Sequence, residues 1–322
     1  MKRIFAFTIL CSLFIFAKAQ EANYSIEHEY HKVGVLNPAW EIDGSLIPNK
    51  YEHITGYYRD NLARIILKAV KENKVKIYDV RKRELPLDSV VNRVIAFEKK
   101  NFNHTLKKDS VWKFILPYVS EYSFEEFVNY NYKTLALEKK VKAYAPTLVR
   151  YHSFSEDKID TVKMELFWVF PESELTQLPQ SKEKKGKSQP QEIFSITDTI
   201  ISCQPLKYPE QNPYVSSMFA KAKAKEACIY KADGSRFAAP KEVDKLFVEM
   251  KSVFVTNEET GQEQKVETSS DILPEDIKTL KIGELWNINT ATLEINKKVL
   301  YEIPLLYNED RNIYFPLGIR VQ

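Results

Sequence analysis

The sequence predicts an α+β protein made of two similar domains, each with two helices packed on a small antiparallel sheet and each with its own hydrophobic interior. The main observation is an internal repeat: residues 126–149 and 284–307 align without a gap at a constant offset of 158, and 77–94 align with 229–246 at an offset of 152. The second is a change, within each copy, from helical to strand-like periodicity. A repeat of roughly 125 residues is too long for a solenoid, whose repeats span about 20–50 residues.

The repeat is carried by polar as well as apolar positions. The identical pairs are Glu126/Glu284, Asn129/Asn287, Asn131/Asn289, Thr134/Thr292, Leu135/Leu293, Lys139/Lys297, Lys140/Lys298, Val141/Val299, Pro146/Pro304 and Leu148/Leu306. The asparagines precede a strand-like run in both copies, where a turn or cap role explains them. Duplication with strong divergence favours a scaffold or binding protein over an enzyme.

The chain divides into five segments. Residues 1–19 are a signal peptide, 20–38 an irregular N-terminal segment, 39–172 the first repeat, 173–193 a linker rich in Lys, Ser, Pro and Gln, and 194–322 the second repeat. The leader has a basic start, an apolar stretch too short to span a bilayer, and the cleavage pattern Ala17-Lys18-Ala19. We therefore expect export to the periplasm without a membrane span.

Removal of the leader changes the charge balance. The full chain has a formal net charge of +3, and the leader holds Lys2, Arg3 and Lys18 without an acidic residue, so 44 basic residues would face 44 acidic ones. No global field remains to attract nucleic acid, and no nucleic-acid partner is expected.

The first copy begins, on this reading, near residue 39. Residues 56–73 have one apolar helical face, a short strand follows at 75–78, and a second helix is predicted with Asp88 as its N-cap. Strand-like runs follow at 135–149 and 160–171, separated by a polar turn, which predicts a hairpin.

The second copy repeats this order. Helices are predicted over 216–227 and 240–250 with a short strand at 228–230 between them. Strand-like runs at 293–307 and 312–321 predict the equivalent hairpin. The single proline in the first strand of each hairpin suits a sheet edge or a strand end.

Several stretches resemble the GldN (PorN) family of gliding-motility and type IX secretion proteins of Bacteroidetes. The segment 277–306, IKTLKIGELWNINTATLEINKKVLYEIPLL, is similar to a run that ends in Ile-Ala-Pro-Leu in that family, and Trp286, Ile303 and Pro304 fall on its Trp, Ile and Pro. The segments 196–209, 223–237, 140–146 and 166–172 resemble further family motifs. The family pattern has one such region followed by a helical tail, whereas this sequence has two copies and lacks the tail, and Val128 replaces the family tryptophan in the first copy.

The resemblance implies a structural role without catalysis or a cofactor. GldN-type proteins assemble in the periplasm with an outer-membrane lipoprotein of the GldK/PorK type into a ring that meets the periplasmic domain of a motor protein. We therefore expect a non-enzymatic scaffold protein of type IX secretion and gliding motility. An exported binding module of unknown ligand, built on the same duplicated fold, is the alternative.

Catalytic and metal-binding patterns are weak in this sequence. Only two residues separate His28 and His31, whereas three separate the histidines of an H-E-x-x-H motif, and no G-x-S-x-G motif occurs. We therefore expect no enzyme, no metal site and no cofactor. Two cysteines follow the leader, Cys203 and Cys228, and they either form a disulfide or remain thiols.

The large aromatic residues are candidates for the core or for a partner surface, since Trp and Tyr are favoured in both. The candidates are Trp112, Phe127, Trp168 and Trp286.

Overall fold

The computed structural model describes residues 23–34, 56–155, 158–171, 174, 193–237, 240–256, 263–308 and 313–322. Helices and antiparallel sheets make up this part of the chain, as expected for an α+β fold. The leader, the expected start of the first repeat near residue 39 and nearly all of the 173–193 linker lie outside the described residues.

The first half contributes a sheet whose described strands run in the order β1-β2-β3-β4. These strands are β1 (Asn23–Gly34), β2 (Val119–Asn131), β3 (Leu137–Ser155) and β4 (Lys158–Glu165). The helices α2 (Gly56–Lys71), α3 (Leu87–Phe102) and α4 (Val111–Ile115) precede β2. The short strand expected at 75–78 is reduced to bridges from Tyr78 to Glu84 and Trp168.

The second half contributes a sheet with the path β5-β9-β10-β12-β6, and β11 pairs with β10 beside it. Its strands are β5 (Ile193–Pro205), β6 (Ile229–Lys231), β9 (Ile277–Asn289), β10 (Ile295–Asn308), β11 (Ile313–Pro316) and β12 (Ile319–Val321). The helices are α6 (Asn212–Lys223) and α7 (Pro240–Asp244). A separate hairpin of β7 (Val248–Thr256) and β8 (Glu263–Asp271) precedes β9.

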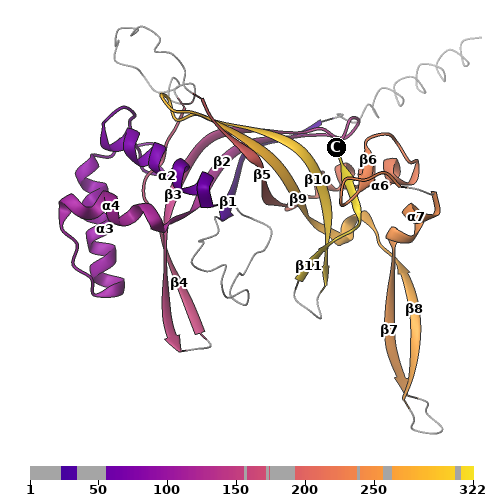
Figure 1. Ribbon diagram of the computed structural model, residues 1–322. Helices are drawn as coiled ribbons and strands as arrows, with labels where there is room; N and C mark the ends of the chain where they lie inside the picture. The colour runs from indigo at the N-terminus through magenta and orange to yellow at the C-terminus, as the bar shows by residue number, and fades with distance from the viewer. Residues whose placement is uncertain are drawn as a thin grey trace, which may run out of the picture.

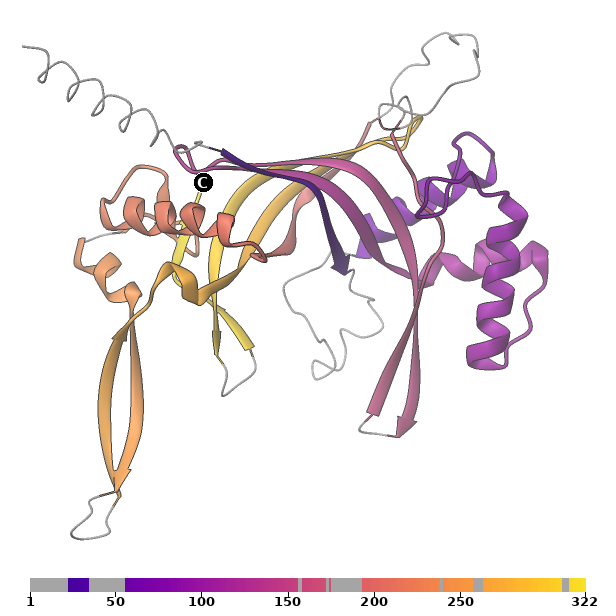
Figure 2. The same cartoon turned by 180° about the vertical axis from the view of Figure 1, so that it is seen from behind.

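The molecule is an arch (Figure 1). The long strands β2, β3, β9 and β10 run along it, α2, α3 and α4 lie at one end, and α6 and α7 lie at the other. The β3–β4, β10–β11 and β7–β8 hairpins project from the same side of the arch, and the reverse view shows β1 along the outer edge of the first sheet (Figure 2).

The strand β1 corrects the expectation of an irregular segment at 20–38 and of a first repeat beginning at 39. Asn23 pairs with Asn131 and Ile26 with Val128, so β1 is an integral part of the first sheet. Most of its side chains are polar, and the pairing partner lies about a hundred residues further along the chain, so local pattern gives little indication of the strand.

Three expectations about helices also differ from the structure. The N-cap of α3 is Pro86, and Asp88 lies in the first turn, where its charge favours the positive end of the helix dipole. The predicted helix 240–250 ends at Asp244, passes through a 3₁₀ turn (Lys245–Phe247) and continues as β7. The described first half has three α-helices where two were expected.

Two hairpin loops in different halves have the same hydrogen bonds. The Oδ1 atom of Asn131 accepts from the Lys133 and Thr134 amides, and that of Asn289 accepts from the Ala291 and Thr292 amides. Each loop then has a leucine in the left-handed region, with φ of 59° at Leu135 and 58° at Leu293. The turn role expected from the sequence is thus confirmed for Asn131 and Asn289, but it is wrong for Asn129 and Asn287, which pair within β2 and β9.

We expect Asn131→Ala and Asn289→Ala each to lower the free energy of unfolding by about 1–2 kcal/mol, because each removes a side-chain acceptor for two loop amides. Urea unfolding of the two variants measures this. Asn287→Ala is the control, because Asn287 is exposed on β9. A loss of stability in only one of the two variants would contradict the equivalence of the two turns.

The interior consists of two main hydrophobic clusters, and each draws on both halves of the chain. The first combines α2, α3, α4, β2 and β3 with Ile196, Ile200, Trp286, Ile288, Leu293 and Ile295 from the second half. The second combines α6, α7, β9 and β10 with Ile26, Val128, Tyr130, Leu135 and Leu137 from the first half. The expectation that each repeat has its own interior is therefore wrong, because the tip of each sheet extends over the other half's helices.

Candidate functional site

Two of the candidate aromatic residues are buried and two are half-buried. Trp286 is fully buried on β9, and Trp168 is 5% exposed beside Tyr78 and Phe170. Trp112 on α4 and Phe127 on β2 are half-buried. Trp286 belongs to the first cluster, although it comes from the second half of the sequence. These four residues therefore do not form a common surface.

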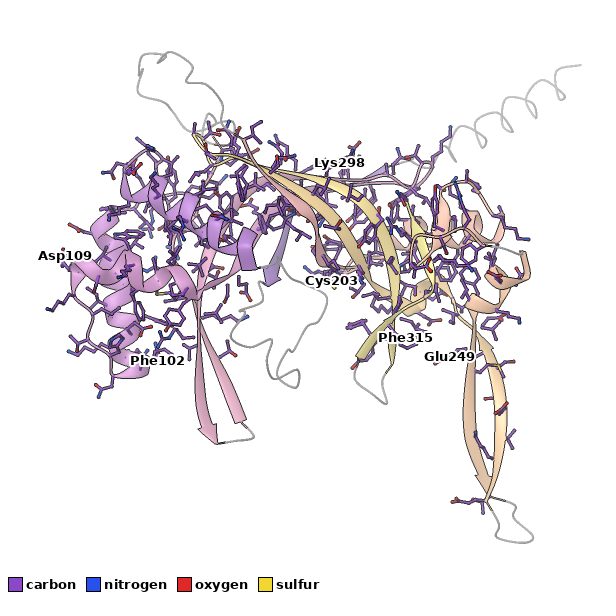
Figure 3. The ribbon with its side chains drawn as sticks, in the orientation of Figure 1. Phe102, Asp109, Cys203, Glu249, Lys298 and Phe315 are labelled. Carbon is purple, nitrogen blue, oxygen red and sulfur yellow. The ribbon has the colours of Figure 1, made fainter. Side chains whose placement is uncertain are left out.

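The two cysteines lie on separate elements. Cys203, labelled in Figure 3, is on β5, opposite Lys281 of β9. Cys228 immediately precedes β6. No disulfide joins them in the structure.

A cluster of four charged side chains lies in the interior between the two sheets. Glu126 on β2 and Lys139 on β3 come from the first half, and Glu284 on β9 and Lys297 on β10 come from the second. All four side chains are fully buried. We call these residues the charge cluster.

The shortest contacts in the charge cluster cross between the halves. Lys139 Nζ donates to Glu284 Oε1 at 2.9 Å, and Lys297 Nζ lies 2.6 Å from Glu126 Oε1. The contacts within each half are longer, at 3.7 Å between Lys139 and Glu126 and 3.9 Å between Lys297 and Glu284. The four residues are thus arranged with approximate two-fold symmetry, and each lysine is paired with the glutamate of the other half.

A β-bulge in each sheet places these side chains on the inner face. In the first sheet the pairing shifts between Glu125/Ala143 and Glu126/Val141. In the second it shifts at the equivalent place, between Gly283/Tyr301 and Glu284/Val299. The bulge adds one residue to β3 and one to β10, which reverses the alternation of side chains between the two faces of the sheet. On β3, Lys139 before the bulge and Tyr144 after it therefore point into the same interior. On β10, the same holds for Lys297 and Glu302.

The charges of the cluster perturb one another strongly. Burial acts to raise the pKa of Glu284, but the ammonium groups of Lys139 and Lys297 outweigh it and lower this pKa. Burial acts to lower the pKa of Lys139, but the carboxylates of Glu284 and Glu126 outweigh it and raise this pKa. The Lys139–Glu284 pair is therefore ionised at neutral pH, and each charge compensates the other.

The two lysines differ in their surroundings. Lys297 Nζ lies 3.3 Å from the ring centroid of Phe124 and 4.3 Å from that of Trp286. The residues equivalent by the 158 offset are aliphatic, Ile282 and Val128. Burial dominates at Lys297 and lowers its pKa, even though Glu126 and Glu284 act in the opposite direction.

A fifth buried acid lies further along β10. Glu302 is 2% exposed, and burial raises its pKa to about 8. The Tyr214 hydroxyl lies 2.8 and 3.0 Å from the two Glu302 oxygens and 2.9 Å from the Leu135 carbonyl oxygen. A hydroxyl has one proton, so when Tyr214 donates to Leu135, a protonated Glu302 carboxyl supplies the second hydrogen bond.

The sequence contains a signal for the charge cluster in the internal repeat. Glu126/Glu284 and Lys139/Lys297 are among the pairs that define the repeat, and buried charges are rare enough that their recurrence marks a structural constraint. Glu302 carries no such signal, because its equivalent in the first half is Tyr144.

Two pockets lie where a hairpin loop of one half meets the other half. One, of about 300 Å³, is lined by 134–137, 299–302 and the chain end at Val321 and Gln322. The other, of about 350 Å³, is lined by 73–76, Tyr78, Val169, Phe170 and the loop residues Ala291 and Thr292. They are shallow openings at the low end of volumes typical for ligand sites.

Comparison with known proteins gives no match for this chain: no protein-family model matches it, and no curated protein matches it significantly. Within the described ranges, no helix has the length and apolar character needed to cross a bilayer.

Proposed function

We propose that the chain is a tandem duplication of one fold, and that it acts as a non-enzymatic periplasmic scaffold related to the GldN ring component. The duplication is supported by the shared bulge position, by the matching asparagine loops and by the two-fold arrangement of the charge cluster. The GldN relation rests on the sequence motifs given above. In this proposal the signal peptide directs export, and an outer-membrane lipoprotein of the GldK/PorK type and a motor-protein domain are the partners.

The observation that carries the scaffold role is the β7–β8 hairpin. It extends from the body of the molecule as a two-stranded ribbon, and Figure 3 shows Glu249 near its base (Figures 1 and 3). Its exposed apolar side chains include Met250 at 65%, with Val248 and Val266 at 37% each. A two-stranded ribbon alone is marginally stable in water, and unpaired strand edges readily pair with another chain. The hairpin therefore suits a contact with another protein strand.

The base of the β7–β8 hairpin is anchored to the body of the molecule, so the hairpin can be shortened without disturbing the rest of the fold. The Ile272 amide donates to the Phe247 carbonyl at 2.7 Å, and both side chains are buried. Replacing residues 250–269 with a two-residue Asn-Gly turn is expected to leave the melting temperature unchanged. It is expected to abolish co-purification with the outer-membrane lipoprotein, because the strand edges that dock are gone.

Two single substitutions of exposed apolar residues, one on the hairpin and one elsewhere, test whether the hairpin side chains contribute to binding. Met250→Ser removes an exposed apolar side chain on the hairpin, and Val80→Ser removes one that is 62% exposed at the other end of the arch. We expect only the first to weaken the complex, measured by pull-down and by sedimentation. Binding that survives shortening of the hairpin contradicts the docking role, and failure of the unaltered chain to bind the lipoprotein contradicts the partner assignment.

The alternative is an exported binding module of unknown ligand, and the two loop pockets are the observation that favours it. Their lining comes from both halves, and ligand pockets occur preferentially at interfaces between domains. A thermal-shift screen with small polar compounds, repeated on Thr134→Trp to fill the first pocket, separates this function from the scaffold role.

A further inference from the structure

The two lysine–glutamate pairs of the charge cluster are not chemically equivalent. Lys139 Nζ makes an aligned hydrogen bond to Glu284, which also accepts from Trp286 Nε1 at 2.8 Å. Lys297 Nζ lies closer to its glutamate, at 2.6 Å from Glu126 Oε1. Glu126 acts on the pKa of Lys297 as a hydrogen-bonding neighbour does, but the contact lacks the alignment of a regular hydrogen bond. The Lys297 ammonium is enclosed by the rings of Phe124 and Trp286.

We propose that Lys297 and Glu126 condense to form an intramolecular amide that covalently links β10 of the second half to β2 of the first. The nucleophile is the Lys297 amine, and the electrophile is the Glu126 carboxyl carbon. The pair is held in contact inside a fully buried site, where proximity replaces a bimolecular encounter and bulk water is excluded.

The neighbouring members of the cluster supply the remaining roles. Glu284 Oε2 lies 3.9 Å from Lys297 Nζ and is a carboxylate, which suits a proton carrier. Lys139 Nζ lies 3.7 Å from Glu126 Oε2, the oxygen that becomes negative in the tetrahedral intermediate. Burial lowers the pKa of Lys297 and so increases the fraction of neutral amine that can attack.

The reaction balances without an external reagent. One proton moves from the Lys297 ammonium to Oε1 of Glu126, giving an amine and a carboxylic acid. The nitrogen lone pair forms a bond to Cδ, and the C=O electrons move to Oε2. Glu284 takes a proton from the nitrogen and gives it to the Oε1 hydroxyl, which leaves as water with the C–O bonding electrons while the C=O bond re-forms.

The asymmetry between the halves explains why only one pair reacts. The equivalent pair, Lys139 and Glu284, is kept ionised by a hydrogen bond and by the raised pKa of Lys139. At the positions equivalent to Phe124 and Trp286, this pair has the aliphatic residues Ile282 and Val128. The Lys139–Glu284 pair therefore remains a salt bridge and assists the condensation of Lys297 with Glu126.

Mass spectrometry of the purified full chain, denatured and digested, tests the proposal directly. We expect a branched peptide in which Lys297 is joined to Glu126 and which is lighter than the two separate peptides by one water molecule. Lys297→Met and Glu126→Ala are expected to abolish it. Because the masses are read after denaturation, a variant that folds poorly still gives a result.

Two further variants test the assisting groups, and one serves as a control. Glu284→Gln and Lys139→Met are expected to lower the bridged fraction at least tenfold. Lys163→Met, which breaks a half-exposed ion pair with Glu121, is expected to leave it unchanged. Separate, unmodified peptides containing Lys297 and Glu126 in the unaltered chain overturn the proposal, as does a branched peptide joining Lys139 to Glu284.

Discussion

Replacing Lys139 with methionine is expected to lower the free energy of unfolding by about 3–5 kcal/mol, because it leaves the buried Glu284 carboxylate without its principal counter-charge. Lys139 and Glu284 are both fully buried and form an aligned hydrogen bond at 2.9 Å. Chemical denaturation at neutral pH measures the loss.

The double variant Lys139→Met/Glu284→Gln is expected to regain most of that stability. It removes both charges of the pair, and the glutamine can still accept from Trp286 Nε1. A double-mutant cycle then isolates the interaction between the two side chains.

Lys163→Met is the matched control for this cycle, because Lys163 pairs with Glu121 while 43% of its side chain remains exposed. An exposed pair of this kind contributes about 0–1 kcal/mol. A loss at Lys139 no larger than the loss at Lys163 would contradict the buried-charge interpretation.

Glu302→Gln is expected to remove a pH dependence of stability that the unaltered chain shows between about pH 4.5 and 8. Burial raises the pKa of Glu302 from 4.5 to about 8, so between these values the folded state holds a proton that the unfolded state has released. The contribution of the protonated group is fully present below pH 4.5 and is lost as the pH rises through about 8. The total loss is at most about 5 kcal/mol.

The glutamine amide imitates the protonated carboxyl, because its NH₂ group can donate to the Tyr214 oxygen while Tyr214 donates to Leu135. Urea unfolding of both proteins at intervals from pH 4.5 to 8 gives the comparison. Glu294→Gln serves as the control, since Glu294 lies in a loop and is partly exposed. Parallel pH profiles for the unaltered chain and Glu302→Gln would show that Glu302 titrates normally.

Helices and hairpins with local signals could be predicted from the sequence. The run 56–73 has an uninterrupted apolar face and forms α2 over Gly56–Lys71, and the two C-terminal hairpins form from alternating strands with polar turns. The turns at Asn131 and Asn289 could also be predicted, because a turn asparagine accepts hydrogen bonds from amides only two and three residues away.

The remaining features depend on contacts that the local sequence does not contain. Residues 87–118 and 240–276 occupy the same position before the central strand of each half, yet the first forms α3 and α4 and the second forms a short helix and the β7–β8 hairpin. In the second half the helix ends at Asp244, and a 3₁₀ turn leads into β7. The charge cluster could be found only as a recurrence, since its pairing between halves depends on how the sheets overlap.

The exchange of sheet tips between the two hydrophobic clusters has a consequence for folding kinetics. A chain emerging N-terminus first presents α2, α3 and α4 long before Trp286, Ile288, Leu293 and Ile295, which complete the cluster around them. Contacts this distant in sequence slow folding and prolong the exposure of apolar surface. The first half therefore cannot complete its hydrophobic cluster before β9 and β10 have been synthesised.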